Sequence, residues 1–374
     1  MQKIIFLSPV SFFKGGAERS LFDLMSNPDI FPILVTPDTG EIPDKAKNLA
    51  ITAYILPFRS ISTIRRPFIF LQGFTVLLDL YKTAKQLNNI ATETGATIIH
   101  SNGLKAHAIN CVARLIGKTK AILHIRDIPY TRAEKLVWYI LYMLSNNFIV
   151  VSAACWPFQK FPSKVKIVHN GTPLIEGISQ KVLKQPIIIG FIGRIHPAKG
   201  LHLLIDWLAK ARSIQIDVKL SVRGDFSEDA VVGYQNQIKQ QIERLNLGSV
   251  IEFTGFIADP DLVYKNIDLV VVPSQVPDPL PRSVMEAMAR KIPVMGYPAG
   301  GIGEMILDYK TGFMVNNSDN FIKALKFIVD NPEKIQVISE SAVNHIKNNF
   351  SIQNLYQKMN DIYKNNMNIN INNK

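Results

Sequence analysis

The sequence is poor in cysteine and has no long uninterrupted apolar run. Its 374 residues include two cysteines, Cys111 and Cys155, which lie far apart and lack the spacing of metal ligands. This excludes a disulfide framework, and we expect two buried thiols of a reducing compartment. The absence of a run of about 18 apolar residues excludes an ordinary membrane-spanning helix. The short apolar run at the N-terminus is expected to be a buried strand rather than a secretory signal.

Acidic residues are scarce in the first half of the chain. Residues 1–185 hold 22 Lys+Arg against 11 Asp+Glu, whereas residues 186–374 hold 20 against 19, so the first half carries nearly all of the net charge of +12. This asymmetry favours an anionic partner, either a membrane surface, a phosphorylated substrate or a nucleic acid. No RNA- or DNA-binding module accompanies the charge, so we expect no nucleic-acid partner. An idle, solvated basic face is the alternative.

Short β-rich apolar runs alternate with helical segments, and this series restarts near residue 186. Such alternation predicts the α/β class, with parallel sheets covered by helices on both faces. Two series predict two doubly wound, Rossmann-like domains, residues 1–182 and 186–349, joined by a polar seam within 176–185. The polar, low-complexity C-terminal tail is expected to fray.

Ligands of open parallel sheets bind beyond the carboxyl ends of the strands, so the loops after strands are the candidate sites. The first such loop carries Gly15 and Gly16 before a helix, where a backbone can approach a phosphate. A later loop carries Arg194 and Lys199, two cations able to grip a diphosphate. An ordinary tight turn and two solvated cations are the respective alternatives.

Two acids frame the stretch "PDPLPRSVMEAMARKIPVMGYPAGGIGEM". Asp278 lies in a loop kept extended by prolines, and Glu286 lies in the helix that follows. A carboxylate in a helix can accept both hydroxyl hydrogens of a ribose, and a loop carboxylate can accept from sugar hydroxyls. The alternatives are a helix-dipole acid and a turn-forming Asp. Gly300 and Gly301 then form a second possible ring of backbone donors before a helix.

Together these motifs resemble family 4 retaining glycosyltransferases of the GT-B fold, and the similarity spans the whole chain. It rests on five segments in order: "GGAERSL", "KVKIVHNGTPL", "GRIHPAKGLHLLIDWLA", the block from Ala258 to Val315, and "FSIQNLYQKMNDIYKN". The resemblance implies two domains facing a cleft, the first binding the acceptor and the second a nucleotide-sugar donor. It also implies that the last helix, about residues 350–366, crosses back to the first domain.

The resemblance implies a role for each matching residue of the donor domain. Glu286 would bind the donor's ribose and Asp278 its sugar hydroxyls, while Arg194 and Lys199 would neutralise the leaving diphosphate. Gly15 and Gly16 of the first domain would pack against that diphosphate. The sequence departs from the family pattern at three positions: the first acid is Asp278 rather than Glu, and Pro281 and Lys291 stand where glycine is common.

The reacting carbon in this family is often approached by a histidine from one of two loops of the first domain. His100 and His124 both follow first-domain strands, and Asn102 occupies the ligand-facing position of the first loop. We therefore predict His124 as the catalytic histidine, with Arg126 nearby, and Asn102 as a ligand contact. A histidine held at the edge of the core is the alternative.

Residues 59–88 combine cations with an apolar run. Arg59, Arg65 and Arg66 precede the apolar residues, and Lys82 and Lys85 follow them. This pattern predicts an amphipathic surface element that lies on an anionic membrane. A buried helix with a basic cap is the alternative.

The resulting prediction is a glycosyltransferase that acts with retention in cell-surface polysaccharide or glycolipid synthesis, cytoplasmic and peripheral on the inner face of the membrane. Its donor is a nucleoside-diphosphate sugar and its acceptor a glycan or a lipid-linked glycan. The resemblance implies no metal and no separate cofactor, since cations and helix N-termini stabilise the leaving group. A nucleotide-sugar epimerase on the same fold and a non-catalytic nucleotide-sugar-binding protein are the rival hypotheses. The sequence does not identify the base, the sugar, the linkage or the oligomeric state.

Overall fold

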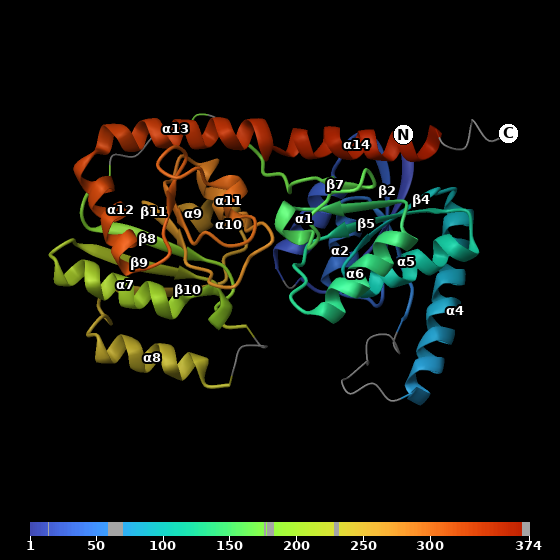
Figure 1. Cartoon of the computed structure of the whole chain (residues 1–374), viewed down its shortest axis with the longest axis horizontal. Coiled ribbons are helices and arrows are strands. Elements are labelled where there is room, and N and C mark those ends of the chain that lie inside the picture. Colours follow the sequence, from blue (N-terminus) through green and yellow to red (C-terminus); the bar gives the residue numbers. More distant parts are fainter. Residues whose placement is uncertain (14, 59–69, 176, 178–182, 228–231, 369–374) are drawn as a thin grey trace. The chain divides into compact units, whose positions relative to one another are not determined.

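The chain divides by its internal packing into two units (Figure 1). The computed structural model describes residues 1–13, 15–58, 70–175, 177, 183–227 and 232–368. The first unit comprises Met1–Gly171 together with Gln353–Lys374, and the second comprises Thr172–Ile352. Most of the polar seam predicted at residues 176–185 lies outside the described residues, as do Arg59, Arg65 and Arg66 and the end of the tail.

The first unit is built on a seven-stranded sheet in the order β3-β2-β1-β4-β5-β6-β7, with every neighbouring pair parallel. The central strands are buried on both faces and are rich in apolar residues, as is typical of parallel sheets, although β4 and β5 also bury histidines. The strands are β1 (Gln2–Leu7), β2 (Ile30–Thr36), β3 (Thr52–Ile55), β4 (Ile98–Asn102), β5 (Lys120–Ile125), β6 (Asn147–Val150) and β7 (Val165–Ile167).

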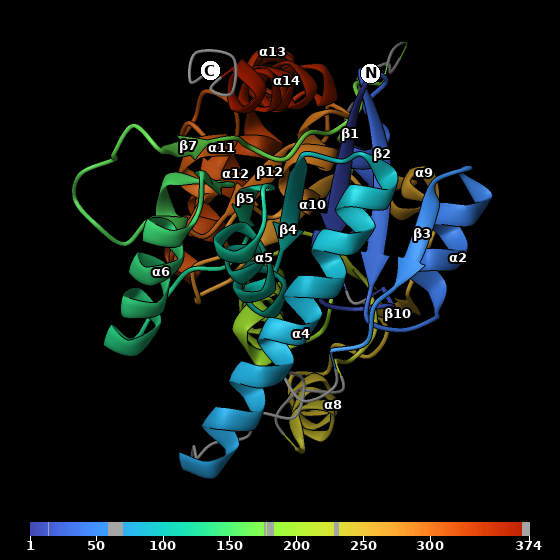
Figure 2. The ribbon, with the colours of Figure 1, turned by 90° about the vertical axis from the view of Figure 1, so that its right-hand side faces the viewer.

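Helices cover this sheet, and three of them, α4, α5 and α6, lie side by side in Figure 2. The helices of the first unit are α1 (Gly16–Met25), α2 (Glu41–Asn48), α4 (Phe70–Thr94), α5 (Leu104–Ile116), α6 (Arg132–Leu144), the single turn η1 (Ala153–Cys155) and α14 (Ile352–Asn368). No helix in the described part of the chain is both long and apolar enough to cross a membrane.

The second unit is built on a six-stranded parallel sheet in the order β10-β9-β8-β11-β12-β13. Its strands are β8 (Ile187–Ile192), β9 (Val218–Arg223), β10 (Ile251–Gly255), β11 (Leu269–Val272), β12 (Val294–Gly296) and β13 (Phe313–Met314). Its helices are η2 (Pro197–Lys199), α7 (Leu201–Ser213), α8 (Tyr234–Arg244), α9 (Pro260–Tyr264), α10 (Arg282–Met288), α11 (Ile302–Met305), α12 (Ser318–Asp330) and α13 (Pro332–Asn349).

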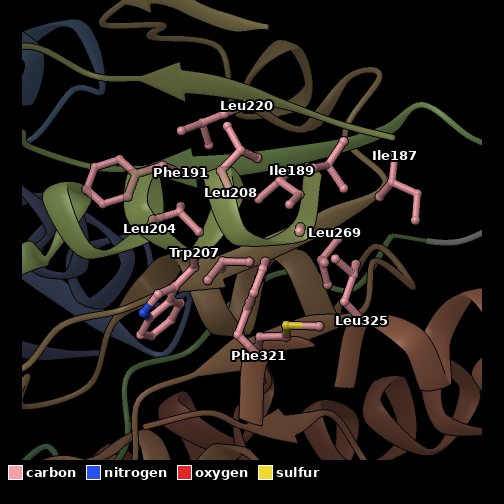
Figure 3. Close-up of a cluster of buried hydrophobic side chains, with 14 of the residues drawn as sticks. Ile187, Ile189, Phe191, Leu204, Trp207, Leu208, Leu220, Leu269, Phe321 and Leu325 are labelled. Atoms are coloured by element: carbon pink, nitrogen blue, oxygen red, sulfur yellow. The ribbon is translucent and has the colours of Figure 1, made fainter. Parts of the chain in front are cut away.

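The core of the second unit joins the sheet to the helices on one of its faces (Figure 3). Ile189 and Phe191 of β8 pack in one cluster with Trp207 of α7 and Phe321 of α12, and all four are at least 95% buried. The rings of Trp207 and Phe321 lie 5.5 Å apart. This apolar burial is the main force that holds the sheet and its helices together.

The first six strands of each unit follow the same order: the second and third strands lie on one side of the first strand, and the fourth lies on its other side. The chain therefore reverses direction between β1 and β4 in the first unit, and between β8 and β11 in the second. A doubly wound sheet binds its ligands at the carboxyl end of this reversal point. The predicted fold class is confirmed, and the loops that follow β1, β4, β8 and β11 are the places to seek a site.

The last helix, α14, packs on the first unit, as the family resemblance implied. The Tyr363 hydroxyl contacts His100 Nδ1 at 2.8 Å, and Asn27 donates from Nδ2 to Asn360 Oδ1 at 2.8 Å. Asn366 reaches Asn147 beside β6 in the same way, at 2.6 Å. Polar contacts along its length thus fix α14 against the first sheet.

Three histidines lie in the core of the first unit, where they are neutral. His100 in β4, His107 in α5 and His124 in β5 are each at most 1% exposed. Burial, with the Arg126 charge as the next cause, lowers the pKa of His100 and of His107 to about 3. Burial also holds the pKa of His124 well below its ordinary value. Protonation of any of them would leave an unpaired charge in the core.

This cluster predicts that acid unfolds the first unit before the second. A histidine of the unfolded chain binds a proton near pH 6.5, whereas these remain neutral in the folded state to about pH 3, so the folded state loses stability as pH falls through that window. Below pH 6, His100 and His107 together should lower the free energy of unfolding of the first unit by about 2.7 kcal/mol for each pH unit. In a Trp207→Phe variant the remaining tryptophans, Trp138 and Trp156, both lie in the first unit, so the fluorescence of this variant reports the unfolding of that unit.

The matched reporter is Trp138→Phe/Trp156→Phe, which leaves Trp207 of the second unit as the only tryptophan of the chain's three. Urea titrations of both variants from pH 7.5 to 5 measure the two pH slopes by fluorescence. The slope of the first unit should be steeper. Equal slopes in the two units would contradict the argument.

Candidate functional site

The loop after β8 presents two of the predicted cations at the carboxyl edge of the second sheet. Arg194 is exposed, and its guanidinium lies 3.4 Å from Ser227 Oγ. Lys199 ends the turn η2, whose start is capped by His196 Nδ1 accepting from the backbone N–H of Ala198 at 3.1 Å. The cap satisfies a donor that the turn leaves unpaired, which fixes the course of the loop.

Gly200 allows the β8 loop to touch the loop after β11. Its φ of +75° is in the left-handed region, and a Cβ added there would lie 2.2 Å from the backbone oxygen of Pro273. No residue other than glycine fits such an approach without displacement of one loop. The close contact brings together the two loops that flank the reversal point of the second sheet.

An ion pair joins the same two loops. Lys199 Nζ binds Asp278 Oδ2, although the two residues are 79 positions apart in the sequence. The Asp278 side chain is 11% exposed and that of Lys199 is 35% exposed, so the carboxylate is enclosed while the ammonium faces both the loop and solvent. The family resemblance implied that Lys199 faces the diphosphate of the donor and Asp278 its sugar hydroxyls, and the structure shows the two side chains in direct contact.

The glycine-rich turn after β12 is attached to the backbone at Asp278. The N–H of Gly301 donates to the Asp278 carbonyl at 2.8 Å, and Gly300 pairs with Asp278 as an isolated bridge. Gly300 has a φ of +65°, and a Cβ there would lie 2.1 Å from the same carbonyl oxygen. Three loops, after β8, β11 and β12, therefore meet around Asp278.

Glu286 projects from α10 into a buried polar network. It is 7% exposed, and each of its carboxylate oxygens is engaged: Oε1 accepts from Arg282 Nε at 3.0 Å, and Oε2 accepts from the Tyr264 hydroxyl at 2.9 Å. Burial, and then the Glu286 charge, raise the pKa of Tyr264 well above its ordinary value, so the hydroxyl stays a donor. A ribose diol at Glu286 would have to share or replace these two donors.

Lys291 ends this helical region with a φ of +58°, in the left-handed conformation. It therefore occupies the position at which the family pattern has glycine, and its ammonium is held by Glu340 at 2.5 Å. Pro281 precedes the first residue of α10, where a missing N–H costs no helical hydrogen bond. Both departures from the family pattern are thus accommodated locally.

In the first unit, Gly15, Gly16 and Asn102 lie at the carboxyl ends of β1 and β4. The backbone N–H of Gly15 donates to Glu18 Oε2 at 2.8 Å, which closes the first turn of α1, and a Cβ on Gly15 would meet nothing within 4 Å. The Oδ1 atom of Asn102 accepts from Arg126 Nε at 2.7 Å, and Arg126 also binds Asn170. Asn102 and Arg126 therefore form one polar cluster at this edge.

His124 does not lie in that cluster. It is the fifth residue of β5 and is 0% exposed, with Nδ1 3.2 Å from His100 Nε2. Its other nitrogen, Nε2, is buried and hydrogen-bonded to no described group. The end of the strand explains the difference: His124 lies inside β5, which is buried through Ile125, and Arg126 is the first residue beyond the strand. In this structure Arg126, and not His124, reaches the candidate edge.

Three residues of the polar networks were not foreseen from the sequence. Arg282 could have been found, because it precedes Glu286 by four positions on a helix, the spacing of an ion pair. Tyr264 and Asn170 meet Glu286 and Arg126 through tertiary packing, and no local pattern marks them. In the part of the chain that the structure describes, no three His, Cys, Asp or Glu side chains are grouped to hold a metal ion.

Solved structures with a similar fold cover nearly the whole chain. A crystal structure of HepE from Anabaena in complex with UDP covers 97% of this chain and 100% of its own, with a TM-score of 0.79 and 22% identity. A glycosyltransferase from Rickettsia africae covers 97% of this chain and 98% of its own, with a TM-score of 0.79 and 20% identity. The fold is that of the GT-B glycosyltransferases.

The sequence comparisons also find glycosyltransferases among the similar proteins. Residues 176–345 match the family model described as glycosyl transferases group 1. The chain is 30% identical over 186 residues to the putative glycosyltransferase YtcC of Bacillus subtilis, covering 47% of this chain and 45% of YtcC. It is 27% identical over 190 residues to the lipopolysaccharide 1,2-N-acetylglucosaminetransferase of Salmonella typhimurium, covering 49% and 50%. The match thus spans about half the length of these relatives.

Gly300 provides a direct test of the loop arrangement. Gly300→Ala should destabilise the second unit by about 1–3 kcal/mol from the strained φ alone, with the clash at Asp278 in addition. Gly303→Ala is the matched control, because a Cβ there meets nothing closer than 4.0 Å and the residue is helical. Urea titration should show a loss only for Gly300→Ala. Equal stability of the two variants would contradict the described turn.

Proposed function

We propose that this protein is a glycosyltransferase that moves a sugar from a nucleoside-diphosphate sugar to a glycan or lipid-linked acceptor. The observation that carries the proposal is the Lys199–Asp278 ion pair at the reversal point of the second sheet, inside the group 1 glycosyl transferase domain. A cation that can bind a diphosphate and a carboxylate that can accept hydrogen bonds from sugar hydroxyls therefore lie together in one site. The rival hypotheses of an epimerase and a non-catalytic binding protein have no comparable observation in their favour.

The donor would be held by groups whose charge and position match its parts. Arg194 and Lys199 face the negative diphosphate, and the loops after β8 and β12 offer backbone N–H groups in turns built on glycine. Glu286 takes the ribose at the cost of its bonds to Tyr264 or Arg282. Asp278 takes the sugar hydroxyls once Lys199 has turned to the diphosphate. HepE has been solved with UDP and with UDP-glucose, so UDP-sugars are the first donors to test.

Transfer is proposed to proceed with retention of configuration and without a metal ion. The departing nucleoside diphosphate gains negative charge as the bond to the sugar breaks, and preorganised cations at that position lower the barrier. Lys199 and Arg194 supply this charge from fixed loops. The expected result is activity that persists in the presence of a chelator and a product with the anomeric configuration of the donor.

The acceptor is assigned to the first unit, which has most of the positive charge. Arg126, held by Asn102 and Asn170, presents a fixed cation at the carboxyl edge of this sheet. We propose a growing surface glycan, lipid-linked or free, and peripheral attachment to the inner face of the membrane. The lipopolysaccharide enzyme of Salmonella typhimurium supports this class of acceptor.

The proposal is tested by release of nucleoside diphosphate from a panel of nucleoside-diphosphate sugars, with and without chelator. Release that increases when glycan or glycolipid acceptors are added indicates transfer. Binding of the donor without release would favour the non-catalytic protein, and interconversion of the free sugar nucleotide would favour the epimerase.

The diphosphate cations give the first prediction for this site. Lys199→Ala removes the charge that faces the leaving group, and we expect turnover to fall by about 10²–10³-fold. Arg194→Ala should act in the same direction. Lys210→Ala is the matched control, since Lys210 pairs with Asp319 on the surface of the same unit. Steady-state kinetics measure the three variants, and wild-type turnover in Lys199→Ala would refute this role.

The two acids should have separable effects. Asp278→Asn keeps the shape of the side chain and releases Lys199 from its ion pair, so affinity for a free nucleoside diphosphate should stay or rise while affinity for the complete sugar donor falls. Glu286→Gln should weaken both ligands, because the ribose is common to them. Calorimetric titrations measure these affinities, with Glu340→Gln as a control on another ion pair of the same unit. Equal losses of nucleoside diphosphate affinity in both variants would contradict the assignment.

A further inference from the structure

The outward face of α6 is apolar where a surface helix is ordinarily polar. Five of its large apolar side chains are exposed: Leu136 (59%), Val137 (37%), Tyr139 (48%), Ile140 (47%) and Met143 (57%). Trp138 and Leu141 supply the buried side, so the core already has its own apolar stripe from this helix. A helix that is apolar on both sides has a face for which the described chain provides no cover.

The apolar face continues onto the segment before β7. Phe161 is 45% exposed, and Trp156, whose ring lies 6.3 Å from that of Phe161, is buried against Tyr142 of α6. The Trp156 indole N–H donates to the Lys160 carbonyl at 2.8 Å, which fixes this turn. We call the six exposed residues, Leu136, Val137, Tyr139, Ile140, Met143 and Phe161, the α6 patch.

Cations surround the α6 patch, and acids are nearly absent. Residues 104–166 contain ten lysines and arginines and two acids, a net charge of +8, and no acid occurs between residues 135 and 166. Arg132 and Lys160 are exposed and Lys135 is half-buried. One of the two acids, Glu134, is held by the backbone N–H groups of Tyr130 and Thr131 at 2.8 and 2.9 Å. The rim of the patch is therefore strongly positive.

The C-terminal end of α6 is fixed by two further cations. Lys164 donates to the carbonyls of Tyr142 and Met143, and Arg114 donates to that of Leu144 at 2.8 Å. These bonds satisfy carbonyls that a helix end leaves unpaired, and they complement the helix dipole. The helix thus presents its apolar face on a rigid support.

We propose that the α6 patch is the surface by which this protein docks on an anionic lipid bilayer. Exposed aliphatic side chains enter the interface between headgroups and acyl chains, Tyr139 and Phe161 lie at its level, and Arg132, Lys135 and Lys160 meet the anionic headgroups. A second copy of the chain is disfavoured as the occupant, because a symmetric dimer would bring two surfaces of the same positive charge together. The inference deepens the proposed membrane attachment and rests on it.

The site differs from the one predicted from the sequence. That prediction relied on Arg59, Arg65 and Arg66, which lie outside the described residues, and on the helix now seen as α4. In α4, Leu77 (63%) and Leu78 (42%) are exposed, so this helix is the natural rival surface. Figure 2 shows α4 and α6 on either side of α5, which allows the two to be tested by separate substitutions.

The test is cosedimentation with vesicles, measured without donor or acceptor. The wild-type chain should bind vesicles of phosphatidylcholine mixed with phosphatidylglycerol about 100-fold more tightly than vesicles of phosphatidylcholine alone, from three rim cations. Leu136→Gln/Ile140→Gln/Met143→Gln leaves the net charge unchanged and should weaken binding to the anionic vesicles by about tenfold or more. The matched change Leu77→Gln/Leu78→Gln in α4 should leave binding unchanged.

A second variant keeps the proposal testable if the triple glutamine variant does not fold. Arg132→Gln/Lys135→Gln/Lys160→Gln retains the apolar patch and should reduce binding on anionic vesicles to the level seen on neutral ones. Folding of each variant is checked by its thermal midpoint and by nucleoside diphosphate binding in the second unit. Because vesicle binding needs no nucleotide, its failure is distinguishable from a failure of the proposed transfer reaction.

Three results would overturn the proposal. Undiminished vesicle binding by the folded α6 variants would remove the patch as the anchor, and loss of binding only in the α4 variant would assign the anchor to that helix. The third result has three parts: the wild type does not bind vesicles, it sediments as a dimer, and the triple glutamine variant sediments as a monomer. This would show that the patch joins two copies of the chain.

Discussion

The ion pair between Lys199 and Asp278 is the interaction on which the candidate site depends. It joins the loop after β8 to the loop after β11, and the turn after β12 is attached to the same Asp278 backbone. Gly200 and Gly300 make these approaches sterically feasible. The carboxylate of Asp278 and the ammonium of Lys199 neutralise each other, and the carboxylate is enclosed while the ammonium is partly exposed. A ligand that carries both a diphosphate and hydroxyls can replace the ion pair: its diphosphate takes the place of Asp278 beside Lys199, and its hydroxyls take the place of Lys199 beside Asp278.

The two sheets have the same arrangement of their first six strands but place different polar side chains at the carboxyl ends of those strands. A parallel sheet in this strand order leaves one crevice at the carboxyl ends of its strands, and polar side chains gather there because the faces are covered by helices. In the second unit the crevice contains the ion pair, with Glu286 buried behind it. In the first it contains Asn102 and Arg126, and the adjoining surface is basic with an uncovered apolar helix face. We therefore propose that donor chemistry and acceptor recognition belong to separate units of one chain.

The sequence was sufficient for the fold because strand and helix periods alternate regularly, and because glycines and prolines mark the loops that follow strands. Lys199, Asp278, Gly300 and Gly301 were predicted individually, and the structure shows that they share one site. His124 illustrates the limit: it was expected in a loop after a strand, but the strand continues to Ile125 and His124 is buried within it. A shift of two positions in the end of a strand decides whether a side chain lies in the core or at the edge. Tyr264 lay beyond sequence reasoning, since its contact with Glu286 is made by the packing of α9 on α10.

The central claim, that a nucleoside diphosphate binds where the loops after β8, β11 and β12 meet, is tested most directly by hydrogen–deuterium exchange. The amides of the whole chain are followed with and without saturating nucleoside diphosphate. The account predicts slower exchange in residues 193–200, 274–286 and 297–303 of the second unit, with the amides of α12 and α8 unchanged. Protection that spares all three loops and appears elsewhere in the second unit would contradict it.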